Sequence, residues 1–460
     1  MKKLLLIFTI PELRRKVLIT LLFLLIYRIG YYIPLPMVNQ ENLAKRMADL
    51  SQGALGQLIG YVSLFSGGNL SQSCIFALGI MPYISASIIL QLLASSGLSP
   101  ALDKLRKEPN GQKKINEYTR YLTVPICMIQ AMIFVQSIMG RSASGTELTA
   151  YGYNLGINYL YYGFAAVLTI TIGTLFLMWL GEQIEEYGIG NGISLIIMAG
   201  IISRIPDATR LLLLDPTTGK LKGSIFTLGS PTGDVSFEKL VLLVILFVTV
   251  VVGVIAITKA QRRIPTQSAK HQRGRRAYGG TRQWLPLKVN QAGVMPVIFA
   301  STLLIIPGFL FRLLSDITGS DWAMSLASNF QRNSGFIYNC SYILMIYFFC
   351  YFWTAITMNP KEIANQLKDS GSFIQGIRPG KQTANHIEKI MLRVTYVGAA
   401  FLAIIAIIPS LISSELEVDY RVASFYGGTG LLIVISVCLD LVQKINAHLV
   451  MRNYEGLTDD

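Results

Sequence analysis

The sequence predicts an all-α, polytopic membrane protein with ten transmembrane helices in two inverted five-helix halves. Of its 460 residues, 52% are hydrophobic and only 14% are charged, whereas a soluble domain averages roughly 25% charged residues. Apolar runs of about 18 residues, enough to cross a bilayer as a helix, recur along the whole length. Lysine and arginine gather on alternate connections between these runs, which is typical of a polytopic protein with a fixed orientation.

Ten apolar runs account for the predicted spans. In order, they are residues 17–33, 75–93, 121–138, 159–180, 189–205, 240–257, 292–310, 336–358, 392–412 and 425–442. The second is interrupted by Gly79 and Pro82, and the fifth and tenth are short or rich in glycine. We expect each run to form one membrane-crossing helix.

Positive charge sets the expected orientation. The N-terminal segment before the first span is basic, and so are the loops after spans two, six and eight. The loop after span three contains only Arg141, and the loop after span nine only Arg421. Cytoplasmic loops contain the excess of Lys and Arg, so both termini are expected on the cytoplasmic side.

Four parts are expected along the chain. Residues 1–204 form an N-terminal half with spans one to five, and residues 205–236 an extracytoplasmic connection. Residues 237–446 form a C-terminal half with spans six to ten, and residues 447–460 a cytoplasmic tail. Turn signals at 215–219 and 230–233 indicate a small hairpin in the connection 205–236, outside the membrane. Two halves with an odd number of spans must be oppositely oriented, which is the arrangement of an inverted repeat. The halves show no convincing sequence similarity, so this symmetry is inferred from topology.

The interrupted stretch 65–93 points to a path through the membrane. It is apolar enough for membrane depth, yet it contains Gly67-Gly68, a run of hydroxyls, Gly79 and Pro82. Irregular backbone is tolerated in a bilayer only where protein buries it or where it lines a water-filled cavity. A simple membrane anchor does not need such breaks.

Residues that could drive chemistry are scarce in the spans. The ionisable residues in or beside the spans lie near span ends and not at span centres, among them Arg28, Glu182, Arg393 and Asp440. The three histidines, His271, His386 and His448, lie outside the spans. The five cysteines show no metal-ligand spacing and are interpreted as small apolar packing residues. Proton-coupled carriers need ionisable groups inside the membrane. We therefore expect no enzyme, no metal and no cofactor. A passive conduit or a non-conducting scaffold remains, ahead of a secondary transporter.

Two polar regions each allow two interpretations. Residues 181–194 contain several glycines, which suit either tight helix packing or a hinge. The loop 258–290 is dense in Arg and Lys, with Pro265, Tyr278 and Trp284 between them. Such a loop either sets topology against anionic lipid or docks RNA phosphates or an acidic protein. Its length exceeds what orientation requires and favours docking.

Several ordered motifs resemble the SecY family, the channel subunits of the bacterial Sec protein translocase. The stretches 65–69 and 73–93 are similar to the family's second span. Further matches are Asn116-Glu-Tyr-Thr-Arg-Tyr121, Met178-Trp-Leu-Gly-Glu-Gln183, Gly188-Ile-Gly-Asn-Gly-Ile-Ser194, Leu285-Pro-Leu-Lys-Val-Asn290, Gly376-Ile-Arg-Pro-Gly380 and Tyr426-Gly-Gly-Thr429. These blocks follow one another along essentially the whole chain.

The resemblance implies a ten-helix clamshell around an hourglass pore that opens across the membrane and sideways into lipid. An apolar ring would close the waist of the pore, and its members would be Ile80, Ile84, Ile193, Ile197, Met295 and Ile433. Met295 departs from the more usual isoleucine, but methionine is apolar and flexible. Such a constriction blocks ions by dewetting. A removable plug would comprise Ser63, Leu64, Phe65, Ser66, Gly67, Gly68, Asn69, Leu70, Ser71 and Gln72.

The resemblance also implies a lateral gate and docking sites. The gate would separate spans two and three from spans seven and eight, with Ser87, Gln91, Gln130 and Asn290 as its polar residues. Arg262, Arg263 and Arg378 match the family's docking arginines for the ribosome and the motor ATPase SecA. Implied partners also include the small subunits SecE and SecG, signal sequences, nascent chains and membrane lipid. The implied location is the bacterial inner membrane.

Three positions depart from the family's pattern. The loop after span six reads Arg263-Ile-Pro-Thr-Gln-Ser-Ala-Lys270, where an Asn-Tyr pair is common before Ala-Lys. Span eight ends in Met358-Asn-Pro360 rather than Phe-Asn-Pro, and the connection 203–238 is longer than usual. These departures bear on the details of docking rather than on the implied function.

Overall fold

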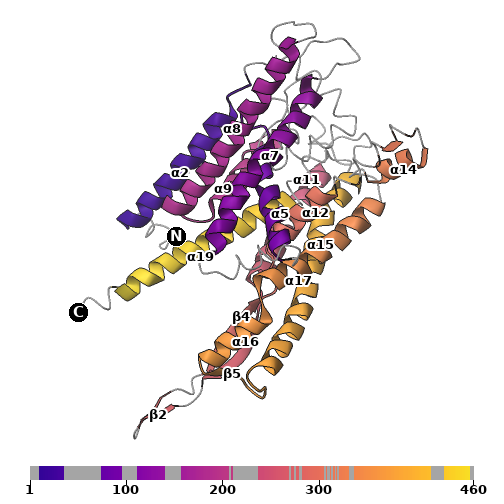
Figure 1. Cartoon of the computed structure of the whole chain (residues 1–460). Helices are drawn as coiled ribbons and strands as arrows, with labels where there is room; N and C mark the ends of the chain where they lie inside the picture. The colour runs from indigo at the N-terminus through magenta and orange to yellow at the C-terminus, as the bar shows by residue number, and fades with distance from the viewer. Residues whose placement is uncertain are drawn as a thin grey trace. The chain divides into compact units, whose positions relative to one another are not determined.

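Helices dominate the structure, a computed structural model. It describes residues 10–35, 74–95, 111–139, 157–206, 209–210, 237–268, 271–273, 276–278, 282–304, 321–330, 336–415 and 429–455, with a few positions between 307 and 318. The helices are α2 (Pro11–Tyr31), α5 (Met81–Ser95), α7 (Gly111–Met139), α8 (Ile157–Tyr187), α9 (Gly192–Ile202), α11 (Phe237–Lys259), α12 (Met295–Leu303), α14 (Asp321–Asn329), α15 (Phe336–Thr357), α16 (Pro360–Asp369), α17 (Lys381–Glu415) and α19 (Thr429–Glu455). The strands are β1 (Gln261–Ser268), β2 (His271–Arg273), β3 (Arg276–Tyr278), β4 (Arg282–Lys288) and β5 (Ser372–Ile374) (Figure 1).

Each of the ten predicted spans overlaps one helix, which is consistent with the predicted count. Among the described residues, six helices are long and apolar enough to cross a membrane, and α5 and α9 are shorter apolar helices. Several helices extend beyond their apolar runs: α17 begins at Lys381 although its apolar run begins at residue 392. Its polar first turns bury Ala384, Ile387 and Met391. Packing therefore extends the helix where hydropathy gives no signal.

The chain forms two compact units. One comprises Met1–Asp207 together with Val437–Asp460, and the other comprises Ala208–Ser436. The predicted hairpin of the connection falls outside the described residues.

In the first unit, α7 packs against both α5 and α8, and α8 packs against α2 and α9. Its hydrophobic core joins the end of α2, the entry to α5, and α7 and α8. The core residues are Leu35, Ala77, Leu78, Cys127, Ala131, Phe134, Val135, Ala166, Val167 and Ile170. This core lies beside the entry to the interrupted second span.

In the second unit, α15 packs against α12, α14 and α17, and α16 packs against α17. A three-stranded antiparallel sheet of order β4-β1-β5 lies beyond the apolar helices, and β2 and β3 form a separate two-stranded sheet. The sequence analysis did not predict these strands. A second hydrophobic cluster joins the three-stranded sheet to the first turns of α17 through Ile264, Leu287, Ile374, Ile387 and Met391, and Ile363 and Leu367 of α16 pack against it.

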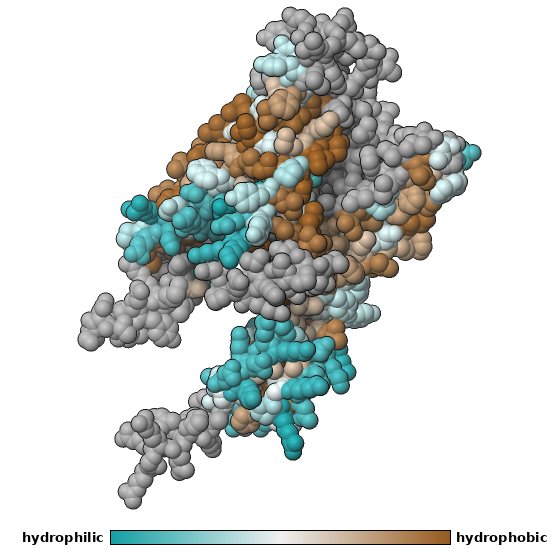
Figure 2. Space-filling model, in the orientation of Figure 1, coloured by the Kyte–Doolittle hydropathy of each residue, from teal (hydrophilic) through white to brown (hydrophobic). Residues whose placement is uncertain are grey.

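The surfaces of the long helices are apolar. Exposed side chains on α2 include Leu18, Leu22 and Leu25, and those on α11 include Ile245 and Val248. Figure 2 shows brown surface over the long helices and teal surface over α16 and the sheet beside it. Contiguous exposed apolar surface of this extent is typical of a protein that contacts membrane lipid or a partner protein within the membrane.

Candidate functional site

The entry to α5 bears two of the predicted ring residues. Gly79 adopts a left-handed backbone (φ 56°), a conformation that glycine reaches without steric cost. The helix begins two residues later, and the Ile84 amide donates to the Ile80 carbonyl at 3.2 Å. Ile80 and Ile84 thus lie one turn apart on the same face. They are 1% and 8% exposed. The break expected at Gly79 is present.

A close set of contacts holds this entry in place. The Ile75 amide donates to the Ile33 carbonyl at 3.2 Å. Phe76 stacks on Tyr27 of α2 and Phe176 of α8, with ring centroids 6.4 and 6.0 Å apart. A Cβ added at Gly173 of α8 would overlap the Ile75 carbonyl. The Ile75 backbone and the Phe76 ring therefore pack against α2 and α8, and these contacts fix the position of the chain before Ile80.

Two further predicted ring residues lie on α9. Ile193 is half-buried and Ile197 is 4% exposed, and their spacing of one turn places them on one face. Asn191 caps the helix, because its side-chain oxygen accepts from the Ser194 amide at 3.0 Å. A left-handed glycine, Gly190 (φ 105°), precedes the cap. The beginning of α9 is therefore defined locally.

The glycine-rich region around this reversal packs tightly. A Cβ at Gly192 would overlap the Gly181 carbonyl oxygen. The Ile189 amide donates to Thr20 Oγ1 of α2 at 3.1 Å. These contacts fit the packing interpretation of residues 181–194, and the hinge interpretation stays a prediction.

The second unit places the other two predicted ring residues at helix beginnings. Met295 is the first residue of α12 and is half-buried. Ile433 lies in the second turn of α19 and is 2% exposed. Gly293 is left-handed (φ 65°) and stands two residues before α12.

One local pattern recurs at three of these helices. A left-handed glycine stands two residues before the first residue of each of α5, α9 and α12, at Gly79, Gly190 and Gly293. Two of the corners also share the pattern Gly-x-Met-Pro, as Gly79-Ile-Met-Pro82 and Gly293-Val-Met-Pro296. Proline suits the beginning of a helix, where its missing N–H removes no hydrogen bond. The sequence analysis missed this match between the halves, and aligning the two corners would have found it.

The predicted plug and gate are only partly described. Residues 63–72 lie outside the described residues. On α5, the Gln91 Nε2 donates to Ser87 Oγ at 3.2 Å, so the structure brings these two gate candidates together. Gln130 is half-buried on α7, which packs against α5. Asn290 is half-buried in the second unit, just after β4.

The predicted docking arginines belong to one sheet region. Arg262 and Arg263 are exposed on β1, and Arg378 is exposed just after β5. Strand β5 pairs with β1 from Thr266↔Ile374 to Ser268↔Ser372. The two basic loops, which the sequence analysis treated separately, thus form a single structure.

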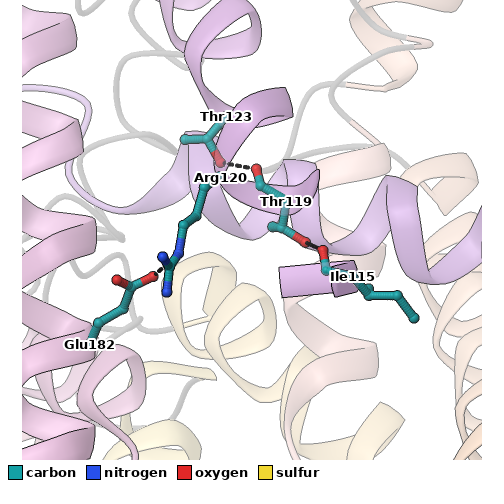
Figure 3. Close-up of polar contacts among 5 residues, drawn as sticks. All are labelled: Ile115, Thr119, Arg120, Thr123 and Glu182. Carbon is teal, nitrogen blue, oxygen red and sulfur yellow. Dashed lines mark hydrogen bonds and ion pairs between the residues drawn. The ribbon is translucent and has the colours of Figure 1, made fainter. Parts of the chain in front are cut away.

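An ion pair that the sequence analysis did not predict joins two of the motifs. Arg120 Nε of α7 lies 2.7 Å from Glu182 Oε1 of α8, as Figure 3 shows. Thr119 and Thr123 on α7 donate to the carbonyls of Ile115 and Thr119, at 2.8 and 2.7 Å. These hydroxyls are therefore satisfied within the helix. The opposite charges of Arg120 and Glu182 were the one sequence feature that pointed to this ion pair.

In the described part of the chain, no group of three or more His, Cys, Asp and Glu residues is placed to hold a metal ion. The cysteines are free: Cys74, Cys127 and Cys350 are buried, whereas Cys340 and Cys438 are exposed. The exposed Cys438 contacts Met198, with the sulfur atoms 3.7 Å apart.

Comparison with known proteins identifies the family. The sequence profile of the SecY family matches residues 74–442. The protein translocase subunit SecY of Aquifex aeolicus is 40% identical over 453 residues, which cover 98% of this chain and 97% of that protein.

Solved channels share the fold. The chain resembles a solved protein-conducting channel with a TM-score of 0.61 at 19% identity, covering 97% of this chain and 95% of that one. It resembles Sec61 of the canine ribosome-channel complex from the endoplasmic reticulum with a TM-score of 0.59 at 18% identity and the same coverage. The long apolar helices, their glycine corners and these matches agree: this chain is a membrane protein that belongs to the SecY family.

Proposed function

We propose that the chain is the central pore-forming subunit of a Sec translocon. It conducts unfolded secretory polypeptides across the cytoplasmic membrane and releases transmembrane segments laterally into lipid. The proposal includes a bacterial inner-membrane location with both termini cytoplasmic. The curated relative named above is a protein translocase subunit, which supports this reading.

One observation supports a pore more than any other. The six predicted ring residues are all apolar, and all lie within the first two turns of α5, α9, α12 and α19 or directly before them. A left-handed glycine stops three of these helices from extending backwards. A helix that begins inside a membrane needs protein or a water-filled cavity around its first N–H groups. Apolar side chains at that level suit a dewetted constriction.

Deletion of residues 63–72 tests the pore. In planar bilayers we expect the deletion variant to pass ions that the intact channel blocks, because the proposed plug is gone. Silence in both would favour a non-conducting scaffold. Proteoliposomes with the motor ATPase test the substrate. Solute uptake without preprotein translocation would favour a secondary transporter.

We further propose that the sheet region docks the cytoplasmic partners, the ribosome and the SecA motor, while SecE and SecG associate within the membrane. The chain supplies no ATP-binding Gly-x-x-x-x-Gly-Lys loop, so the driving energy would come from a partner. Arg262, Arg263 and Arg378 are exposed on one small structure, and guanidinium groups bind phosphate bidentately. A structural relative forms part of a ribosome-channel complex, which supports the ribosome as a partner.

A further inference from the structure

The three-stranded sheet has two faces of different character. On β1, Ile264 and Thr266 are buried, whereas Arg263 and Pro265 are exposed. Successive side chains of a strand point to opposite faces of the sheet. Ile264 packs with Leu287 in the cluster beneath the sheet. Arg263 and Pro265 therefore mark the other face, which points outward.

The strand register completes this outward sheet face. Pro265 lies opposite Trp284, and Arg263 lies opposite Pro286. Directly opposite residues of antiparallel strands share a face. The outward sheet face thus includes Arg263, Pro265, Trp284 and Pro286, and the exposed Lys288 continues it along β4. Pro265 and Trp284, which the loop sequence contains far apart, become neighbours.

Trp284 is strongly exposed for its size. It is 58% exposed, and its neighbours on this face are Pro265 on the opposite strand, Pro286 on its own strand and Arg263 on the diagonal. An exposed ring in such a setting is typical of an interaction site. A tryptophan ring loses little conformational entropy on binding because it turns about only two side-chain bonds. The outward sheet face therefore offers a rigid, flat, apolar surface within a basic rim.

The chemistry of the surrounding loop selects the class of partner. Residues 258–290 contain no Asp or Glu, and their cations are Lys259, Arg262, Arg263, Lys270, Arg273, Arg275, Arg276, Arg282 and Lys288. Phosphate is therefore attracted without local repulsion, and arginine matches it bidentately. RNA is bound by aromatic rings that stack on unpaired bases, often on a sheet surface, with cations on the backbone. An acidic protein would be attracted by the same charges but has no base for the tryptophan ring to stack on.

We propose that the outward sheet face binds an unpaired base of an RNA, with the Trp284 ring stacked on the base and Arg263 on a neighbouring phosphate. Pro265 lies on the opposite strand, directly beside the ring. This inference rests on the proposed docking function. It adds the chemistry of each contact: Trp284 would contact a base, whereas the arginines would contact phosphates. The stacking contact is insensitive to salt, whereas the phosphate contact is not.

Ribosome binding tests the proposal. The full channel complex is placed in nanodiscs of uncharged lipid, and its affinity for large ribosomal subunits is measured at several salt concentrations. Trp284→Ala should weaken binding about 5- to 150-fold, the range of one lost stacking contact, at every salt concentration. Trp284→Phe should restore most of the affinity. Arg263→Gln should reduce the salt slope by about one unit.

Trp322→Ala is the matched control, because Trp322 on α14 is also 58% exposed. It should leave the affinity unchanged. If Trp284→Ala binds ribosomes normally while Arg263→Gln does not, stacking is refuted and docking stands. If the unsubstituted complex fails to bind ribosomes at all, the docking proposal itself fails. If Trp284→Ala impairs only stimulation of the motor ATPase, the outward sheet face binds a protein instead.

Discussion

Gly192 at the beginning of α9 lies against the carbonyl of Gly181 in α8 so closely that no side chain fits between them. Four residues of the reversal, Gly188 to Asn191, bring the two helices to this distance. The short gap explains why the glycines in this region suit packing.

Gly192→Ala should therefore be destabilising. The added methyl group would force α8 and α9 apart, and overpacking of this kind costs about 1–3 kcal/mol. We expect a lower thermal unfolding midpoint of the purified complex. Gly163→Ala in α8 is the control, because nothing lies within 4 Å of the position its Cβ would take. Equal behaviour of the two variants would contradict the packing role.

The Arg120–Glu182 pair should couple α7 to α8. Both side chains are partly exposed, at 48% and 26%, so the coupling should be modest, about 0.2–1 kcal/mol. A double-mutant cycle with Arg120→Gln and Glu182→Gln measures it through the unfolding midpoint. High salt should reduce the coupling. Strictly additive single effects would show that the two charges do not interact.

Gly398 of α17 lies against the backbone of the segment that connects β4 to α12. A Cβ there would lie 2.6 Å from the Val289 carbonyl oxygen, and the Val289 amide donates to the Ala260 carbonyl at 2.9 Å. Gly398→Ala should therefore shift the end of β4 and slow preprotein translocation. Gly253→Ala on α11 is the control, since its Cβ would meet only the Phe401 ring at 3.4 Å. Normal translocation by Gly398→Ala would show that the close contact between Gly398 and Val289 is not needed for translocation.

Ile84→Asn should make the proposed constriction leaky. A buried amide attracts water where a dewetted apolar ring would exclude it, so ion conductance across planar bilayers should rise. Ile84→Leu keeps the surface apolar and should remain tight. A tight Ile84→Asn channel would place Ile84 in packing rather than in the ring.

Arg378→Glu should impair motor-driven translocation far more than folding. Arg378 is exposed, and the Thr383 hydroxyl donates to its backbone carbonyl rather than to its side chain, at 2.9 Å. Reversing the charge should repel an acidic or phosphate partner. Translocation into membrane vesicles and the amount of protein in the membrane should be measured together. Reduced amount of protein would instead indicate a structural role.

The sequence predicted the helical part of the fold well and the sheet not at all. Apolar runs locate helices because each must present apolar surface to lipid, and each predicted span overlaps a helix. Strand β1 reads Gln-Arg-Arg-Ile-Pro-Thr-Gln-Ser, which is polar and contains Pro265. Only its pairing with β4 and with the distant β5 makes it a strand. Long-range pairing leaves no local signal.

The candidate site was predicted unevenly for related reasons. The six ring residues came from family motifs, and the structure adds that they lie at helix beginnings. Ion pairing between Arg120 and Glu182 requires knowing which helices pack together, so the sequence alone could not assign it. The left-handed conformation of Gly79 and Gly293 is likewise a property of the folded backbone. The repeated Gly-x-Met-Pro sequence, however, was readable in advance.

Because β5 comes from the loop after α16 and pairs with β1 from the loop after α11, neither loop is an interchangeable module. A chimera that receives only one loop from a distant relative would contain one foreign strand of the β1–β5 pair. It would also contain foreign residues on one side of the cluster around Ile264 and Ile374. Both loops must be exchanged together for such a graft to fold, and substitutions in one loop should be compensated in the other as relatives diverge.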